Sequence, residues 1–170
     1  MPFEYGTNVT ALVNVLRDAN TTTATHNLSA SLSSAILNDN IQASDPEIIT
    51  VRNDRLPSVF VRISNKDESF AGLGPTGVGS TRTKREAKVI YDVIGMYGKD
   101  SASDSHETLL GQVYTLARNI ETIISHEYTL SNTALWCQAA STDFYGPFNV
   151  QGGGWVKVVL IKVEARYLFR

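Results

Sequence analysis

The run from Gly74 to Thr81, Gly-Pro-Thr-Gly-Val-Gly-Ser-Thr, comes closest to a motif with known chemistry. A phosphate-binding loop has the pattern Gly-x-x-x-x-Gly-Lys-Ser/Thr because its lysine holds the outer phosphates. Ser80 stands at the lysine position. The residues that follow alternate like a strand, whereas a phosphate-binding loop leads into a helix whose N-terminus faces the phosphate. We interpret the run as a glycine-rich loop, with a small nucleotide-using enzyme as an alternative.

The histidines and the single cysteine do not form a recognisable metal site or catalytic pair. His26, His106 and His126 have no further histidine or cysteine at ligand spacing. His126 falls near the end of a predicted helix, where the helix dipole favours a cation. Cys137 follows the apolar residues Ala-Leu-Trp, a setting that predicts a small core residue. The sequence therefore predicts no catalytic residue, no metal and no cofactor.

Positive charge is concentrated in one place, between residues 82 and 88. The cluster consists of Arg82, Lys84, Arg85 and Lys88. Such a cluster could contact phosphate, but Asp67 and Glu68 would lie across from it if the flanking segments pair as a hairpin. We prefer a self-neutralised hairpin, or a salt-bridged contact with a neighbouring subunit, to DNA binding. Asp67/Glu68 and Asp45/Glu47 lie in polar surroundings, whereas catalytic carboxylates need burial to shift their pKa.

Composition indicates one domain over residues 1–170 with a substantial core. The formal net charge of -2 argues against a broad basic surface for nucleic acid. Charged residues make up 19% of the chain, below the usual quarter, and Ser, Thr and Asn fill the difference. The N-terminus lacks the basic and apolar segments of a signal peptide, and no apolar run is long enough to span a bilayer. We therefore expect a protein made and used, or assembled, in a cytosol.

The last sixteen residues predict a long strand that takes the C-terminus into a sheet. Alternate side chains from Trp155 to Phe169 are apolar apart from Lys157. The other face is apolar from Val156 to Leu160 and charged beyond it. We therefore expect both faces of the first half to be covered and one face of the second half to meet solvent. The pattern suggests a protein whose role is assembly.

The spacing of apolar residues along the chain predicts where the remaining helices and strands lie. The predicted helices are a short one over 9–16 capped by Thr7 or Asn8, a weaker one over 28–36, and a long one over 109–124 capped by Asp104 or Ser105. The other predicted strands cover 47–51, 58–65, 86–97 and 134–144. Residues 66–85 contain five glycines or prolines and predict a long loop or the tip of an extended antiparallel hairpin.

The predicted strands follow one another in groups and do not alternate regularly with helices. This order predicts an α+β fold rather than alternating βαβ units. We expect an antiparallel or mixed sheet, with one long helix and a short N-terminal helix packed on it. A long Gly-rich loop or hairpin should project from it. The sequence shows no internal repeat and no domain linker.

In this order of elements the chain resembles the tail-terminator, or tail-completion, proteins of long-tailed bacteriophages, the lambda-type family of the neck region. Two segments carry the likeness. They are Leu-Pro-Ser-Val-Phe-Val-Arg-Ile at residues 56–63 and the final Val-x-Val-x-x-x-x-Val-x-Ala-Arg-Tyr. The glycine-rich loop at residues 70–83 is longer than the family pattern needs.

The resemblance implies a structural virion protein without chemistry of its own. Members of the family form hexameric rings that cap the last ring of tail-tube subunits, stop tube growth and join the tail to the head connector. The implied partners are copies of the chain, the tail-tube protein and a head-connector or head-closure protein, with DNA only passing through the channel and no membrane. The implied location is the virion tail or neck, after assembly in the host cytoplasm. The candidate inter-subunit contacts are Phe70, Leu73, Arg82, Lys84 and Arg85.

Two other functions stay open at this point. The first is another neck component, such as a head-closure or connector protein, or a tail-tube subunit, since tube subunits also use α+β folds with a long hairpin loop. The second is the small nucleotide-using enzyme. Copy number in the particle distinguishes the structural alternatives, and nucleotide-dependent thermal stabilisation tests the enzyme.

Overall fold

The computed structural model describes residues 3–21, 23–44, 56–70, 85–99, 106–149 and 154–169. Its helices are α1 (Tyr5–Asp18) and α2 (His106–His126), with a short 3-10 turn η1 (Asn38–Asn40). Its strands are β1 (Ile41–Ala43), β2 (Ser58–Phe70), β3 (Arg85–Lys99), β4 (Trp136–Asn149) and β5 (Trp155–Phe169).

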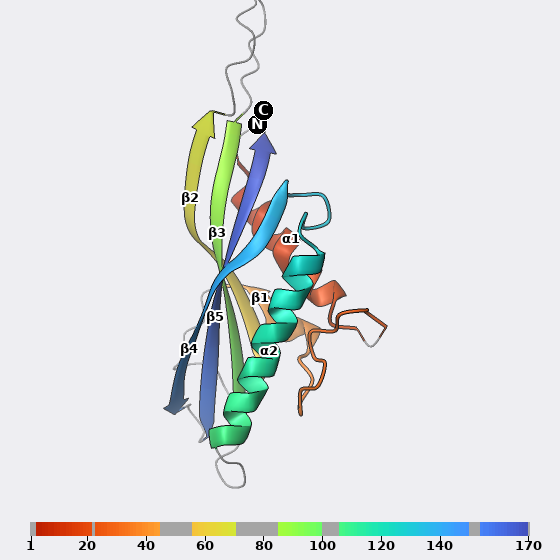
Figure 1. Ribbon diagram of the computed structural model, residues 1–170, viewed down its shortest axis with the longest axis vertical. Helices are drawn as coiled ribbons and strands as arrows, with labels where there is room; N and C mark the ends of the chain where they lie inside the picture. The colour runs from red at the N-terminus through yellow and green to blue at the C-terminus, as the bar shows by residue number, and fades with distance from the viewer. Residues whose placement is uncertain are drawn as a thin grey trace, which may run out of the picture.

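The strands form one mixed sheet in the order β1-β2-β3-β5-β4 (Figure 1). β1 runs parallel to β2, and all other neighbours are antiparallel. The α+β class with a mixed sheet is therefore confirmed. β5, the predicted final strand, lies between β3 and β4 rather than at an edge. It is central because both neighbours pair with it along most of its length.

β2 and β3 form the predicted antiparallel hairpin. Their register places Asp67 opposite Lys88 and Phe70 opposite Arg85. The strands extend further than predicted, since residues 66–70 continue β2 and β3 runs on to Lys99. For residues 66–85 we predicted a long loop or the tip of an extended hairpin. The pairing of β2 with β3 as far as Phe70 and Arg85 confirms the hairpin, while residues 71–84 lie outside the described residues.

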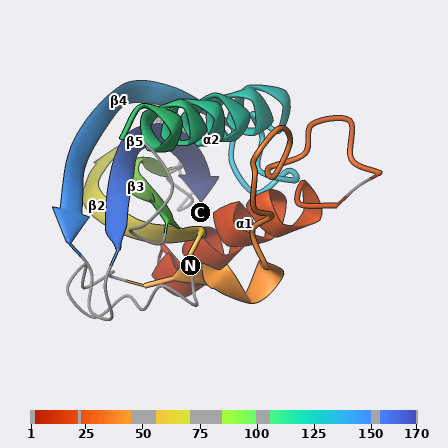
Figure 2. The ribbon, with the colours of Figure 1, turned by 90° about the horizontal axis from the view of Figure 1, so that it is seen from below.

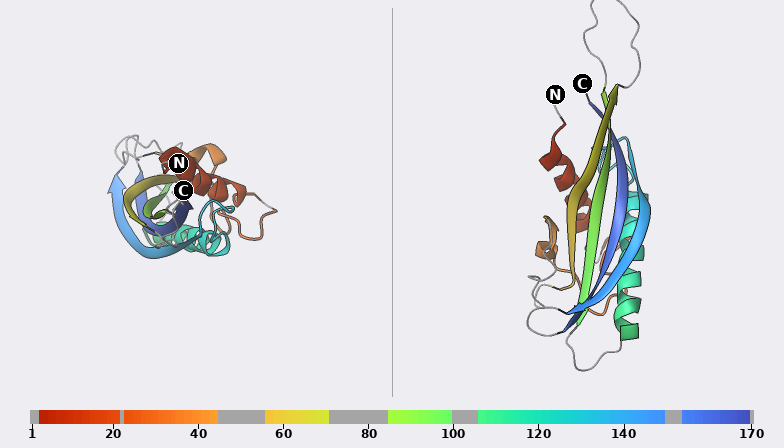
Figure 3. Two further views of the ribbon diagram at one scale, coloured as in Figure 1. Left: turned by 90° about the horizontal axis from the view of Figure 1, so that it is seen from above. Right: turned by 90° about the vertical axis from the view of Figure 1, so that its left-hand side faces the viewer.

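Both helices pack on one face of the sheet, called here the helix face (Figures 2 and 3). The predicted stripe of α2 is confirmed, because Leu116, Ile120 and Ile124 are fully buried. Alternate residues of the strands complete this core, including Val93 of β3 and Ile161 of β5. Period 3.6 in the helices and period 2 in the strands bring the two apolar surfaces together.

α2 approaches β3 closely at Gly95, which lies on the helix face. A Cβ built at Gly95 would be 2.9 Å from the Leu116 Cδ2 and 2.9 Å from the Val159 Cγ1. Real Cβ atoms do not come this close to other side chains. The absence of a side chain at Gly95 therefore allows the two elements to meet.

The other side of the sheet, called here the opposite face, carries no helix among the described elements. Near the end of β3 and the start of β5 it holds a second apolar cluster of Ile94, Met96, Val156 and Val158. Leu56, Phe60 and Leu160 pack against that cluster. The expectation that both faces of the first half of β5 are covered is therefore confirmed. From Lys162 onward β5 is polar and partly exposed on the opposite face only.

The weak helix predicted over 28–36 is wrong, because the segment forms turns in which Leu28 and Ile36 are buried. Polar side chains bond the backbone there instead. Asn20 Nδ2 donates to the Ile36 carbonyl at 2.7 Å, and the Ile36 amide donates to Ser29 Oγ at 2.9 Å. Such side-chain partners compete with helical hydrogen bonds.

The N-terminal helix begins before the predicted cap. Its N-cap is Glu4, so Thr7 and Asn8 lie inside the helix, and Asn8 Nδ2 donates to the Glu4 carbonyl at 2.8 Å. The proposed caps of α2 at 104 and 105, and the strand predicted over 47–51, lie outside the described residues. The short strand β1 was not predicted.

β4 begins two residues later than predicted and continues past the predicted end, across Gly146 and Pro147. Phe148 pairs with Val156 after a register shift that follows Tyr145. β4 is an edge strand, and proline is tolerated on an edge or at a bulge because its missing N–H interrupts no ladder there.

Candidate interaction surface

The predicted inter-subunit contacts fall on the hairpin of β2 and β3. Phe70 ends β2 and Arg85 begins β3, and the two are paired across the hairpin. Leu73, Arg82 and Lys84 lie outside the described residues. The structure therefore places only two of the five predicted contacts, next to each other at one end of the sheet.

Arg85 has an acidic neighbour within its own chain, as the hairpin interpretation predicted. Its Nη1 lies 4.0 Å from Glu68 Oε2, at the outer limit of an ion pair. Glu68 also accepts a hydrogen bond from Lys66. That bond and a hydrogen bond with Tyr5 raise the pKa of Lys66. The ammonium lies 4.9 Å from the Phe3 ring centre and 4.8 Å from the Tyr5 ring centre, so cation–π contacts tie the hairpin to the start of α1.

A row of charges crosses three strands on the opposite face, called here the charge row: Arg62, Asp92 and Lys162. Asp92 accepts from Arg62 Nε at 3.1 Å and from Lys162 Nζ at 3.0 Å. Its side chain is 4% exposed, whereas those of Arg62 and Lys162 are 44% and 41% exposed. Burial acts to raise the pKa of Asp92, but hydrogen bonds from Lys162 and Arg62 outweigh it and the net pKa is lowered.

Further ion pairs continue along this face. Lys88 Nζ lies 2.9 Å from Glu164 Oε2, and Arg166 Nη1 lies 3.1 Å from Glu86 Oε1. Lys88 therefore pairs with β5, although Asp67 is its direct cross-strand neighbour on β2. Alternating signs across the strands make this half of the face polar and largely self-neutralised.

The last third of β4 presents aromatic side chains to solvent. This aromatic strand end consists of Phe144, Tyr145 and Phe148, which are 43%, 47% and 37% exposed. Phe144 makes an edge-on contact with Tyr114 of α2, with ring centres 4.8 Å apart. Tyr145 and Phe148 pair with Val158 and Val156 and share the opposite face with them. Phe144 pairs with Val159 and lies on the helix face, so the three rings do not form one patch. Exposed aromatic groups on an edge strand are typical of contact surfaces.

A groove, called here the edge groove, lies at the other edge of the sheet between α1 and the end of β1. It has a volume of about 410 Å³. Its lining includes Tyr5, Val9, Thr10, Ala43, Arg62 and Ile63. Arg62 is the one charged side chain among the nine residues that line it. β1 pairs only with Val59–Val61, so no described strand pairs with the rest of this edge of β2.

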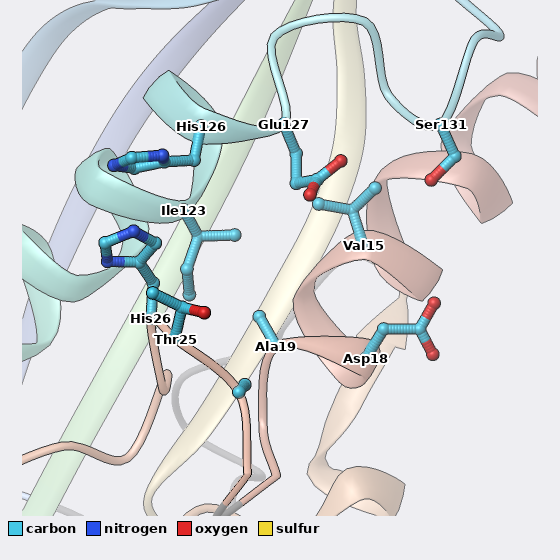
Figure 4. A pocket seen from close by; sticks show the side chains of 10 residues that line it. Val15, Asp18, Ala19, Thr25, His26, Ile123, His126, Glu127 and Ser131 are labelled. Atoms are coloured by element: carbon cyan, nitrogen blue, oxygen red, sulfur yellow. The ribbon is translucent and has the colours of Figure 1, made fainter.

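A smaller pocket, of about 230 Å³, lies between α1, the segment after it and the end of α2 (Figure 4). His26 and His126 stack in it with ring centres 3.7 Å apart, a contact that no sequence spacing predicted. His126 ends α2, as predicted. Stacked rings direct their nitrogens within nearly parallel planes, so the two imidazoles do not converge on one ion. Among the described residues, no group of three His, Cys, Asp or Glu is arranged to hold a metal ion.

Cys137 is confirmed as a core residue. It is buried, and burial raises the pKa of its thiol to about 11. The thiol therefore stays protonated near neutral pH, which leaves it a poor nucleophile. It lies on β4 between the core and the turn after α2, with Sγ 3.7 Å from the Glu127 carbonyl oxygen.

None of the described helices is both long and apolar enough to cross a membrane. Neither a protein-family model nor a curated protein sequence matches the chain.

Proposed function

We propose that this protein is a structural subunit of a phage tail, forming a ring at the head-proximal end of the tail tube. In that role it stops tube growth and joins the tail to the head connector. Copies of the chain would meet edge to edge, one ring face would match the tube end, and the other would meet the head side. The mechanism is interfacial, with no reaction.

The observation that supports this proposal is that the two edges of the sheet, and its two faces, present different surfaces. One face is covered by both helices, while the edge strand β4 leaves three aromatic side chains partly exposed. The other edge holds an apolar groove. A chain with two different contact surfaces at opposite edges can form head-to-tail contacts, which close into a ring when the rotation closes. The order of elements resembles that of tail-terminator proteins, and this resemblance is why we propose a ring at the end of a tail tube.

Electron microscopy of the purified protein, and of the phage particle that contains it, tests this function. We expect rings about a six-fold axis and one ring at the neck of each particle. Many copies along the tube, or self-polymerisation into long tubes, would identify a tail-tube subunit instead. A protein that stays monomeric at every concentration and never copurifies with tails would contradict the proposal.

The nucleotide-using alternative depends on residues 74–81, which lie outside the described residues. No contact or cavity of the described residues favours it. Thermal unfolding with ATP or GTP and Mg²⁺ tests it directly. A rise in melting temperature that is lost in the Gly79→Ala variant would favour the enzyme over the ring.

A further inference from the structure

We propose that the stacked pair of His26 and His126 is a pH-sensitive latch. Near neutral pH it holds residues 23–27, called here the latch segment, on the end of α2, and on acidification it releases them. The inference concerns a contact within one chain, so it goes beyond the proposed ring and does not depend on it.

The stack joins the last residue of α2, His126, to a segment that follows α1. The ring centres are 3.7 Å apart and the ring planes are inclined by 25°, so the rings overlap face to face (Figure 4). His26 is half-buried and His126 is exposed. Solvent therefore reaches the pair and can supply its protons.

The stack is the contact that fastens the latch segment to α2. Among the described residues, no hydrogen bond joins the two, and the Ala24 amide donates to the Thr21 carbonyl at 3.1 Å. The hydrogen bonds to α2 lie further along the chain, where Asn119 Nδ2 donates to the carbonyls of Leu28 and Ala30 at 2.9 Å each. Leu28 is also buried. Breaking the stack should thus free the latch segment and leave the chain from Leu28 onward in place.

The charge of the two rings decides whether the stack holds. Histidine changes its charge between about pH 5 and 8. Two neutral rings stack, and a single imidazolium stacks on a neutral ring through a cation–π contact. Two imidazolium rings with their centres 3.7 Å apart repel each other, because water cannot enter between the faces to screen them. The stack therefore persists with one proton and separates when the pair holds two.

The other charged groups that line this pocket are Asp18 on α1 and Glu127 directly after α2. In Figure 4 both carboxylates lie toward α1, on the side of the pocket away from the stacked rings. No ion pair among the described residues joins either histidine to a carboxylate, and no lysine or arginine lines the pocket. Coulomb energy falls with distance, so repulsion between rings in contact outweighs attraction by the more distant carboxylates.

Hydrogen exchange read by mass spectrometry tests the latch between about pH 7.5 and about pH 5.5, with exposure times scaled to the intrinsic exchange rate at each pH. A peptide over residues 23–27 reports the latch segment, and one over 113–124 of α2 reports the fold. His26→Phe and His126→Phe each keep a flat ring that takes up no proton. His106→Gln is the matched control, because it removes the third histidine of the chain.

In the wild type, protection of the latch segment should fall by about threefold or more on acidification, while protection of 113–124 stays constant. Each phenylalanine variant should keep the neutral-pH protection of the latch segment over the whole range, because its stack holds one charge at most. His106→Gln should behave like the wild type.

Unchanged protection of the wild-type latch segment would overturn the proposal. An equal loss in either phenylalanine variant would also overturn it, since a second group would then control the segment. A simultaneous loss over 113–124 would show acid unfolding of the whole domain and no latch. A phenylalanine variant that is unprotected at neutral pH would show that ring stacking does not hold the segment, which contradicts the inference. The oligomer mass plays no part in these outcomes, so the latch and the ring can fail separately.

Discussion

The two faces of the sheet are built from the same strands but are stabilised in different ways. On the helix face, alternate residues such as Val93 and Ile161 are fully buried under α1 and α2. On the opposite face, the same strands carry an apolar cluster at one end and ion pairs at the other. One-residue alternation thus separates the continuous core of the helix face from an opposite face whose one end is apolar and buried and whose other end is charged.

The difference shows which part of the molecule holds the fold and which part is available for contacts. Burial of apolar side chains contributes most of the stability of a domain, whereas ion pairs with exposed partners contribute little. The helix face, together with the buried apolar cluster on the opposite face, therefore contributes most of the stability. The charged half of the opposite face and the exposed β4 edge should change with smaller effects on folding.

The largest effect is expected on the helix face. Leu116→Ala or Ile120→Ala should lower the free energy of unfolding by about 2–5 kcal/mol, because both side chains are fully buried and would leave a cavity. Urea denaturation measures the change, with the exposed Arg118→Ala on the same helix as control. A loss below about 0.5 kcal/mol, the range of surface substitutions, would contradict this view of the core.

The charge row should contribute less. Asp92→Asn should lower the free energy of unfolding by about 1–3 kcal/mol at pH 7, because it weakens two charge-assisted hydrogen bonds to a buried carboxylate. The lowered pKa of Asp92 stabilises the fold above the unfolded value of about 3.9 and ceases to do so as pH falls through the folded value.

The gap in stability between wild type and Asp92→Asn should therefore be constant above about pH 5 and shrink below about pH 4. Denaturation curves at several pH values measure it. A gap that widens on acidification would show that burial, rather than the two cations, controls this carboxyl group.

A polar contact inside the helix-face core should be worth about 1 kcal/mol. The Tyr91 and Tyr167 hydroxyls lie 2.6 Å apart and are buried. Tyr167→Phe removes one hydroxyl and leaves the other without this partner, which should lower the free energy of unfolding by about 1 kcal/mol. Burial raises the pKa of Tyr167 to about 12, so ultraviolet titration should leave this tyrosine protonated at pH 11. Ionisation near pH 10 would contradict its buried position.

The smallest effect is expected at the exposed ion pairs. Lys88→Ala and Glu164→Ala form a double-mutant cycle around a contact of 2.9 Å whose lysine is largely exposed. The coupling energy should lie between about 0 and 1 kcal/mol and decrease at high salt. A coupling energy above about 2 kcal/mol would contradict the view that ion pairs on the opposite face contribute little to stability.

The sequence alone determined the elements whose patterns are local. The stripe of α2 and the alternation of β5 follow from spacings of two to four residues. The hairpin of β2 with β3 was predicted because two alternating segments flank one glycine-rich stretch. The hairpin also predicted an acidic neighbour for Arg85, which Glu68 supplies. The run Asp-Phe-Tyr-Gly-Pro-Phe at 143–148 contained the aromatic strand end, but no spacing showed that its rings stay in solvent.

Only the tertiary structure decided which distant residues meet. Asp92 lies between Arg62 and Lys162 because the register of three strands aligns residues that are 30 and 70 positions apart. His26 and His126 stack because the segment after α1 returns to the end of α2. Local periodicity sets which face a side chain occupies, but strand register and helix docking depend on the packing of the whole core, which no short stretch of sequence specifies.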